Sequence, residues 1–305
     1  MARYSISGIL GIDARSAEKS LLGINKKVAL FGAAAVAASY KATQGMLEFA
    51  SKSLEAFVQF EKGYTSIFAI LPGASDKWKK EFKGQIQELN MEFGILNEES
   101  IPAIRQALRG GVSKDNLMDW MKDAAHLARA NAMDLTESVK TMTGVMATYG
   151  VKAGTTEEIT DKLTISMREA AVEPDKYAAA LRRLMPMANA VGVPFDELLA
   201  LFTQSVKVTH DAGQSATSME NILAQLTRTT SKASKAFQAQ TGETFPQWVR
   251  SGKGVAEGLN VLWKGAGENA EAFYELFGRM RAGRGAMEIV QKGTGAITEQ
   301  LGLVQ

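Results

Sequence analysis

The chain has 305 residues, of which 46% are hydrophobic and 22% are charged, and its formal net charge is +2. These values exclude a disordered chain, and they exclude a global field that would attract nucleic acid or a membrane surface. The absence of cysteine excludes disulfides, thiolate metal sites and a cysteine nucleophile, and it suits a reducing cytoplasm.

The composition favours an all-α fold. Only six prolines occur, Ala, Leu, Lys, Glu and Met are frequent, and alternating β-branched residues are scarce. Many of the 28 glycines fall where helices should end, which is the expected place for a left-handed cap residue. Residues 1–16 lack an apolar core followed by a cleavage site, so we expect no signal peptide.

A long amphipathic helix is predicted from Ala14 to about Leu71, before the break at Pro72 and Gly73. Its apolar residues are spaced three or four apart, which places them in one stripe. A stripe of this length favours self-association or packing along other long helices, and we expect a homo-oligomer. The residues expected to pack between copies are Leu21, Ile24, Val28, Phe31 and Ala35.

Within this helix the run Val28–Tyr40 is almost entirely apolar. As a helix it would extend about 20 Å at ~1.5 Å per residue, whereas a bilayer core is about 30 Å thick. A small-residue packing face is therefore the favoured interpretation. The alternative that this run leaves open is insertion of the N-terminal helix into a membrane.

Breakers and capping residues divide the middle of the chain into short helices. They are predicted at 76–93, 98–109 and 113–131, and further helices should begin at Asp134, Thr155, Pro174, Pro194 and Thr217. Asn97 is expected to cap the second of these helices.

Three of these starts resemble capping boxes, in which a Ser, Thr or Asp is followed three residues later by Glu. The pairs are Asp134 with Glu137, Thr155 with Glu158, and Thr217 with Glu220. Pro186 is expected to bend or end the helix that starts near Pro174, because proline removes a backbone donor.

After Thr227 the sequence is more polar and richer in glycine. Residues 227–240 are predicted to be a looser helix or linker, and Phe245, Trp248 and Val249 form an apolar cluster in a turn-rich stretch. Helices are predicted at 255–263 and 268–280, followed by a Gly-rich tail with one weak helix. The expected divisions are a helical arm (1–72), a helical-hairpin core (73–230) and a looser C-terminal region (231–305).

One pattern occurs twice between Asp123 and Gly213. Ala124–Gly154 and Arg182–Gly213 each contain a small-residue helix, a short break, a second apolar-striped helix and a closing glycine. Ala-Asn-Ala at 130–132 recurs at 188–190, a shift of 58 positions. Such duplication indicates repeated helical hairpins.

Residues that could carry chemistry have simpler interpretations. His126 and His210 are far apart in the sequence and lack a recognisable nucleophile or orienting carboxylate. Several carboxylates fall in the first turns of helices, where a negative charge interacts favourably with the positive end of the helix dipole. They are Glu98, Glu99, Glu157, Glu158, Asp196 and Glu197. We therefore expect no catalytic, cofactor-binding or metal-binding residue.

Two further motifs are weak. Gly252, Gly254 and Gly258 have one residue too many between them for a dinucleotide fingerprint, and no strand is predicted before them. Arg279, Arg281 and Arg284 could meet phosphate, but they equally suit the cationic last turn of a helix. Specific nucleic-acid binding is therefore not expected.

Three features in this order resemble the core region of phage tail tape-measure proteins. They are the long N-terminal helix ending in FEKGYTSIFAILPG, the duplicated hairpins, and the Leu276, Phe277, Gly278 and Ala282 motif. The stretch Asp211–Arg228, DAGQSATSMENILAQLTR, adds to the resemblance, which covers roughly residues 5–292.

The resemblance implies a scaffold that helps to determine tail length, with no catalytic residue or cofactor. It implies partners among the tail tube protein, tail-assembly chaperones and tail-tip or baseplate proteins. It also implies that the protein is in the host cytoplasm during assembly and in the tail lumen of the finished virion, with membrane contact only on ejection. The alternative function is a membrane-active tail component that inserts its apolar N-terminal helix to aid genome delivery. Tape measures usually continue for hundreds of residues more, so this chain could be an N-terminal piece, a split prophage gene or a short homologue.

Overall fold

The computed structural model describes residues 61–71, 73–278 and 280–304, in which every regular element is a helix. The prediction of an all-α fold is confirmed. The predicted N-terminal helix lies outside these residues except for its end, where 61–68 are helical. The elements are α4 (Asp76–Phe93), α5 (Asn97–Arg109), α6 (Leu117–Ala130), α7 (Leu135–Tyr149), the 3-10 turn η1 (Gly150–Ala153), α8 (Thr156–Ala170), α9 (Pro174–Val191), α10 (Phe195–Thr209), α11 (Ala212–Thr227), α12 (Lys232–Thr241), α13 (Phe245–Arg250), α14 (Val255–Gly265), α15 (Ala270–Phe277) and α16 (Met280–Val304).

Several helix starts follow the predicted capping chemistry. At α8, Thr155 and Glu158 form the full capping box, in which each side chain accepts from the backbone N–H of the other residue. At α7, Asp134 accepts from the N–H of Glu137 at 3.0 Å. The reciprocal half of that predicted box is replaced, because the Glu137 carboxylate binds Lys140 and Arg182.

Two predicted caps are wrong. Asn97 is already inside α5, and its side-chain oxygen accepts from the amide of Asn90 at 2.9 Å, so α5 has no side-chain cap. Helix α11 begins at Ala212 and not at Thr217, because Asp211 caps it by accepting from the N–H of Gln214. A local Thr-x-x-Glu spacing does not distinguish a cap from a helix interior.

Two helix boundaries also differ from expectation. Helix α6 begins at Leu117, four residues later than predicted, because residues 114–116 form a turn. Helix α9 does not end at Pro186 but continues to Val191. The hydrogen bond that proline removes is compensated by burial on both sides, since Leu184, Met185 and Ala188 all face the core.

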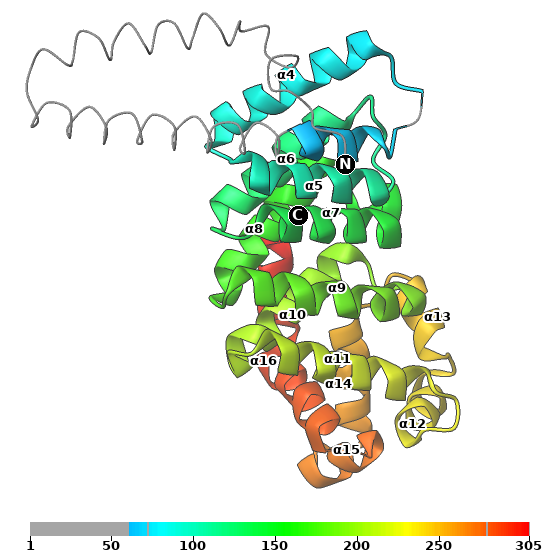
Figure 1. The fold of residues 1–305 in the computed structure, drawn as a ribbon. Helices are drawn as coiled ribbons and strands as arrows, with labels where there is room; N and C mark the ends of the chain where they lie inside the picture. The colour runs from blue at the N-terminus through cyan, green and yellow to red at the C-terminus, as the bar shows by residue number, and fades with distance from the viewer. Residues whose placement is uncertain (1–60, 72, 279, 305) are drawn as a thin grey trace, which may run out of the picture. The chain divides into compact units, whose positions relative to one another are not determined.

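Residues 64–305 form one compact unit, in which most helices are arranged in two layers. Helices α5, α7, α9 and α11 pack successively on one another in one layer, and α4, α6, α8 and α10 do so in the other (Figure 1). The structural repeat is therefore one pair of helices, one from each layer, as in other helical stacks.

This arrangement refines the interpretation of the sequence repeat. A shift of 58 residues places α6 on α9 and α7 on α10, so each helix corresponds to the third helix after it. Corresponding helices therefore lie in opposite layers. The two copies consequently have different neighbours: α6 packs on α7 and α8, whereas α9 packs mainly on α7 and α11.

The Gly-rich tail is not a weak helix but α16, which spans 25 residues. It extends the α4, α6, α8, α10 layer by packing on α10, and it also contacts α11, α14 and α15. Its glycines permit this close packing: a Cβ on Gly283 would lie 2.9 Å from the Tyr274 ring, and one on Gly285 would lie 2.1 Å from Ser218 Oγ. The apolar cluster of Phe245, Trp248 and Val249 is buried, on the short helix α13.

Candidate functional site

The Leu276, Phe277, Gly278 and Ala282 motif forms the corner between α15 and α16. Gly278 ends α15 with a φ of 62°, a left-handed conformation that favours glycine. Phe277 and Ala282 are fully buried on either side of the turn, and the Phe277 ring lies 5.3 Å from the Phe273 ring. The motif therefore builds the corner that returns α16 to the stack.

Other predicted site residues lie elsewhere. Leu21, Ile24, Val28, Phe31 and Ala35 are outside the described residues, as are Arg279 and the side chain of Arg281. His126 is exposed on α6, where its ring meets Phe93 edge-on at 4.8 Å, and His210 is the exposed left-handed cap of α10.

The Gly252 to Gly258 stretch follows helix α13 and not a strand, so it lacks the setting of a dinucleotide site. Gly258 has a packing role instead. It lies inside α14, where a Cβ would come within 2.8 Å of Phe245 Cε2.

Two of the first-turn carboxylates, which are predicted to interact with the helix dipole, also connect different helices of the stack. Asp196 on α10 pairs with Lys162 on α8 at 2.8 Å. Glu197 accepts a hydrogen bond of 2.6 Å from the backbone N–H of Val255 and thereby caps α14, which is 58 residues away. Burial raises the pKa of Glu197, although the Val255 hydrogen bond opposes this shift.

The two arginines of α9 bind the helices on either side of it. Arg182 donates to Glu137 Oε2 at 2.6 Å and to Thr141 Oγ1 at 2.8 Å, both on α7. Arg183 donates to Glu220 at 3.0 Å on α11. Burial by itself would raise the pKa of Glu137, but hydrogen bonds and charge from Lys140 and Arg182 outweigh it and lower that pKa.

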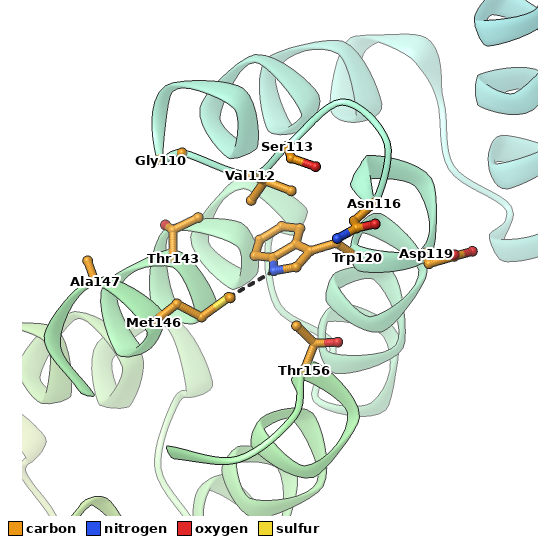
Figure 2. Close-up of a pocket in the computed structure, with 11 residues that line it drawn as sticks. Gly110, Val112, Ser113, Asn116, Asp119, Trp120, Thr143, Met146, Ala147 and Thr156 are labelled. Carbon is orange, nitrogen blue, oxygen red and sulfur yellow. Dashed lines mark hydrogen bonds between the residues drawn. The ribbon is translucent and has the colours of Figure 1, made fainter. Parts of the chain in front are cut away.

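A pocket of about 620 Å³ opens where α5, α6, α7 and α8 meet (Figure 2). The loop after α5 forms one wall, α7 the opposite wall, and Thr156 at the start of α8 closes one end. The lining residues are Gly110, Gly111, Val112, Ser113, Asn116, Asp119, Trp120, Thr143, Met146, Ala147 and Thr156.

Local geometry fixes the walls of the pocket. Gly110 lies so close to α7 that a Cβ on it would come within 2.6 Å of Thr143 Cγ2. Gly111 has a φ of 90°, which turns the chain into the loop 112–116. Thr156 Oγ1 donates to the Asp123 carboxylate on α6, which joins the start of α8 to the same site. These contacts set where the loop after α5 and the start of α8 lie around the pocket.

The chemistry of the pocket is mixed. Trp120 is 4% exposed, and its indole N–H donates to Met146 Sδ at 3.2 Å. Ser113, Asn116 and Asp119 have exposed side chains that make no hydrogen bond or ion pair with any residue the structure describes. Sequence reasoning missed this pocket, because its residues come from three helices and the loop after α5 and share no motif.

The described ranges contain no group of three or more His, Cys, Asp or Glu side chains that could hold a metal ion. Within the same ranges, no helix combines the length and apolar character needed to cross a membrane. The run Val28–Tyr40 lies outside them.

The chain matches a known protein family. A family model described as phage-related minor tail protein matches residues 83–302. The chain belongs to this family. The match begins within α4 and ends within α16, so it covers both layers of the stack and the corner motif.

Two curated relatives of this minor tail protein carry tape-measure names. It is 22% identical over 232 residues to a probable tape measure protein of Clostridium phage phiCD119, covering 73% of this chain and 25% of that protein. It is 22% identical over 207 residues to a tape measure protein of Pneumococcus phage Dp-1, covering 67% and 18%. The predicted resemblance is confirmed, and the chain spans at most a quarter of either relative. No solved structure matches it.

Proposed function

We propose that this minor tail protein is the folded core of a tape-measure protein and acts as a scaffold in tail assembly. The observation that carries the proposal is its similarity to two tape-measure proteins over most of its own length. The scaffold role requires no catalytic residue. The division into an arm (1–72), a core (73–230) and a C-terminal region (231–305) is part of the proposal.

The stacked helices favour a docking role for this region over a measuring role. Each added helix pair extends a two-layer stack by one interhelical distance of about 10 Å. About 40 residues in one continuous helix would extend about 60 Å at ~1.5 Å per residue. The stack therefore gains much less length per residue than one continuous helix would. We infer that any determination of tail length depends on extended parts of the protein.

The proposed partners are other components of the tail: the tail tube protein, the tail-assembly chaperones and the tail-tip or baseplate proteins. The proposed locations are the host cytoplasm during assembly and the tail lumen in the finished virion. Family membership supports contact with tail components in general, and the individual partners follow from the proposed tape-measure role.

A stop codon in place of Trp78 tests the scaffold role in the phage or prophage that carries the gene. We expect capsids without tails by electron microscopy, and tails should return when the full chain is supplied from a plasmid. Tails of normal number and length without the full chain would overturn the proposal.

Self-association through Leu21, Ile24, Val28, Phe31 and Ala35 is tested separately. Val28→Asp introduces a charge into the proposed stripe, and we expect oligomers of the full chain to dissociate in sedimentation velocity. Lys26→Asp is the control, because position 26 is off the stripe by helical spacing. Oligomers that survive Val28→Asp, or a monomeric wild-type chain, would contradict this part alone.

A further inference from the structure

The pocket beside Trp120 has the features of a binding site that the scaffold role does not require. Gly110 packs closely on Thr143 at one side of it, and its volume of about 620 Å³ lies in the range of ligand pockets in proteins. Three polar side chains, Ser113, Asn116 and Asp119, stand at its rim without a partner among the described residues.

The charges of the lining argue against phosphates, nucleotides and nucleic acid. No lysine or arginine is among the residues that line the pocket. Its one ionisable side chain is the exposed Asp119, which makes no ion pair with any residue the structure describes. An anionic ligand would therefore meet repulsion and find no counter-charge, whereas a cationic group would find a free carboxylate.

The inner wall suits a ligand that carries an apolar group next to a carbonyl oxygen. Trp120 is largely buried and adds a small exposed part of its ring to the apolar side chains of Val112 and Met146. Its N–H is bound only by the thioether of Met146, which is a weak acceptor. Met146 is 41% exposed and flexible by chemistry, so it can move aside for a stronger oxygen acceptor. A peptide supplies both an acceptor of this kind and an apolar side chain.

We propose that this pocket binds a short segment of another protein, in which an apolar side chain lies next to a lysine or arginine. The apolar side chain packs against Trp120, Val112 and Met146, and the cationic side chain pairs with Asp119. Ser113 and Asn116 hydrogen-bond the backbone of the segment. The proposal concerns only this pocket, and it stands independently of any measuring role.

The test selects binders from a library of random seven-residue peptides, using the full chain as the target. Selected peptides are synthesised with a fluorescent label, and their affinities are measured by anisotropy. We expect enrichment of Lys or Arg next to Leu, Ile, Phe or Met. Binding should also shift the Trp120 indole N–H resonance, assigned by its loss in Trp120→Phe.

Two variants locate the binding. Ala147→Trp fills the pocket from an exposed position on α7 and should weaken binding at least tenfold, whereas Ala179→Trp on the exposed face of α9 should not. Asp119→Asn should weaken binding up to about fivefold, as expected for an exposed ion pair, and Asp161→Asn should leave it unchanged.

Several results would overturn the proposal. They are a library that yields no binder, selection of acidic peptides, and affinities that Ala147→Trp leaves intact. Equal losses in Ala147→Trp and Ala179→Trp, or in Asp119→Asn and Asp161→Asn, would also overturn it.

Discussion

Arg182 on α9 holds Glu137 on α7 through a bond of 2.6 Å between Nη2 and Oε2, while its Nη1 donates to Thr141 Oγ1 at 2.8 Å. Both charged side chains are about three-quarters buried. The pair joins neighbouring helices of one layer, and α7 and α9 belong to different copies of the sequence repeat. The stack is therefore stabilised between the copies as well as within them.

Removing the Arg182 guanidinium should weaken the contact between α7 and α9 and lower the stability of the chain. For Arg182→Ala we expect a loss of about 1–2 kcal/mol in the free energy of unfolding, between the values for exposed and buried pairs. Urea unfolding followed by circular dichroism measures it. Lys77→Ala is the control, since its pair with Glu81 is long at 3.9 Å and exposed. Equal losses in the two variants would contradict a special role for Arg182.

The same pair should make stability depend on pH. The folded-state pKa of Glu137 is below its ordinary value of 4.5, so its stabilising contribution is present above that value and is lost as the pH falls through the folded pKa. Wild type should therefore be more stable than Glu137→Gln at pH 7, and the difference should shrink below about pH 4. A constant difference in urea unfolding from pH 7 to pH 3 would refute this.

Glu197 should show the opposite dependence. Burial raises its folded pKa, so its contribution favours folding at pH values below the ordinary pKa and is lost as the pH rises through the folded value. Glu197→Gln keeps an oxygen that can accept from Val255 N–H and removes the buried charge. We expect this variant to be more stable than wild type at pH 7.5, with a smaller difference at pH 4.

Glu257→Gln is the control for this measurement, because Glu257 is exposed on α14. Glu197→Ala should be less stable than Glu197→Gln by about 1 kcal/mol, since it leaves the start of α14 without its cap. A Glu197→Gln variant that is less stable than wild type at pH 7.5 would show that the charge itself is needed.

The sequence predicts local features better than long-range ones. Thr155 with Glu158 is a complete capping box, and Gly94 ends α4 in a left-handed conformation, because both depend on a few neighbouring residues. Helix α16 is longer than the weak helix predicted for the Gly-rich tail, because its glycines lower helix propensity and yet permit close contact with α11 and α15. The Glu197 cap and the Trp120 pocket depend on residues that only the stacking brings together.

Replacing each of two helical glycines by alanine should change the stability of the chain in opposite directions. At Gly258, a Cβ would approach Phe245 to 2.8 Å and Phe237 to 3.3 Å, so we expect Gly258→Ala to destabilise the chain by about 1–3 kcal/mol. At Gly84 in α4 no described atom beyond the adjacent residues and backbone of the same helix lies within 4 Å of the added Cβ, so Gly84→Ala should stabilise the chain by about 1 kcal/mol. Thermal unfolding compares them, and a shift of the same sign in both would contradict the packing argument.

Duplication of one helix pair should distinguish docking from measuring. Repeating residues 155–193 in frame adds about 40 residues as a second copy of α8 and α9. A measuring role at ~1.5 Å per residue would lengthen the tail by about 60 Å. In a two-layer stack the added pair extends the protein by about 10 Å. We therefore expect tails that are unchanged within the spread of wild-type lengths in electron micrographs.

Circular dichroism and thermal unfolding of the purified duplicated chain are the controls, since a misfolded insert could also prevent assembly. A folded chain that produces tails about 60 Å longer would show that the stack is extended inside the tube and measures length directly. A folded chain that produces no tails would instead point to a fixed spacing between partner sites on the two sides of the insertion.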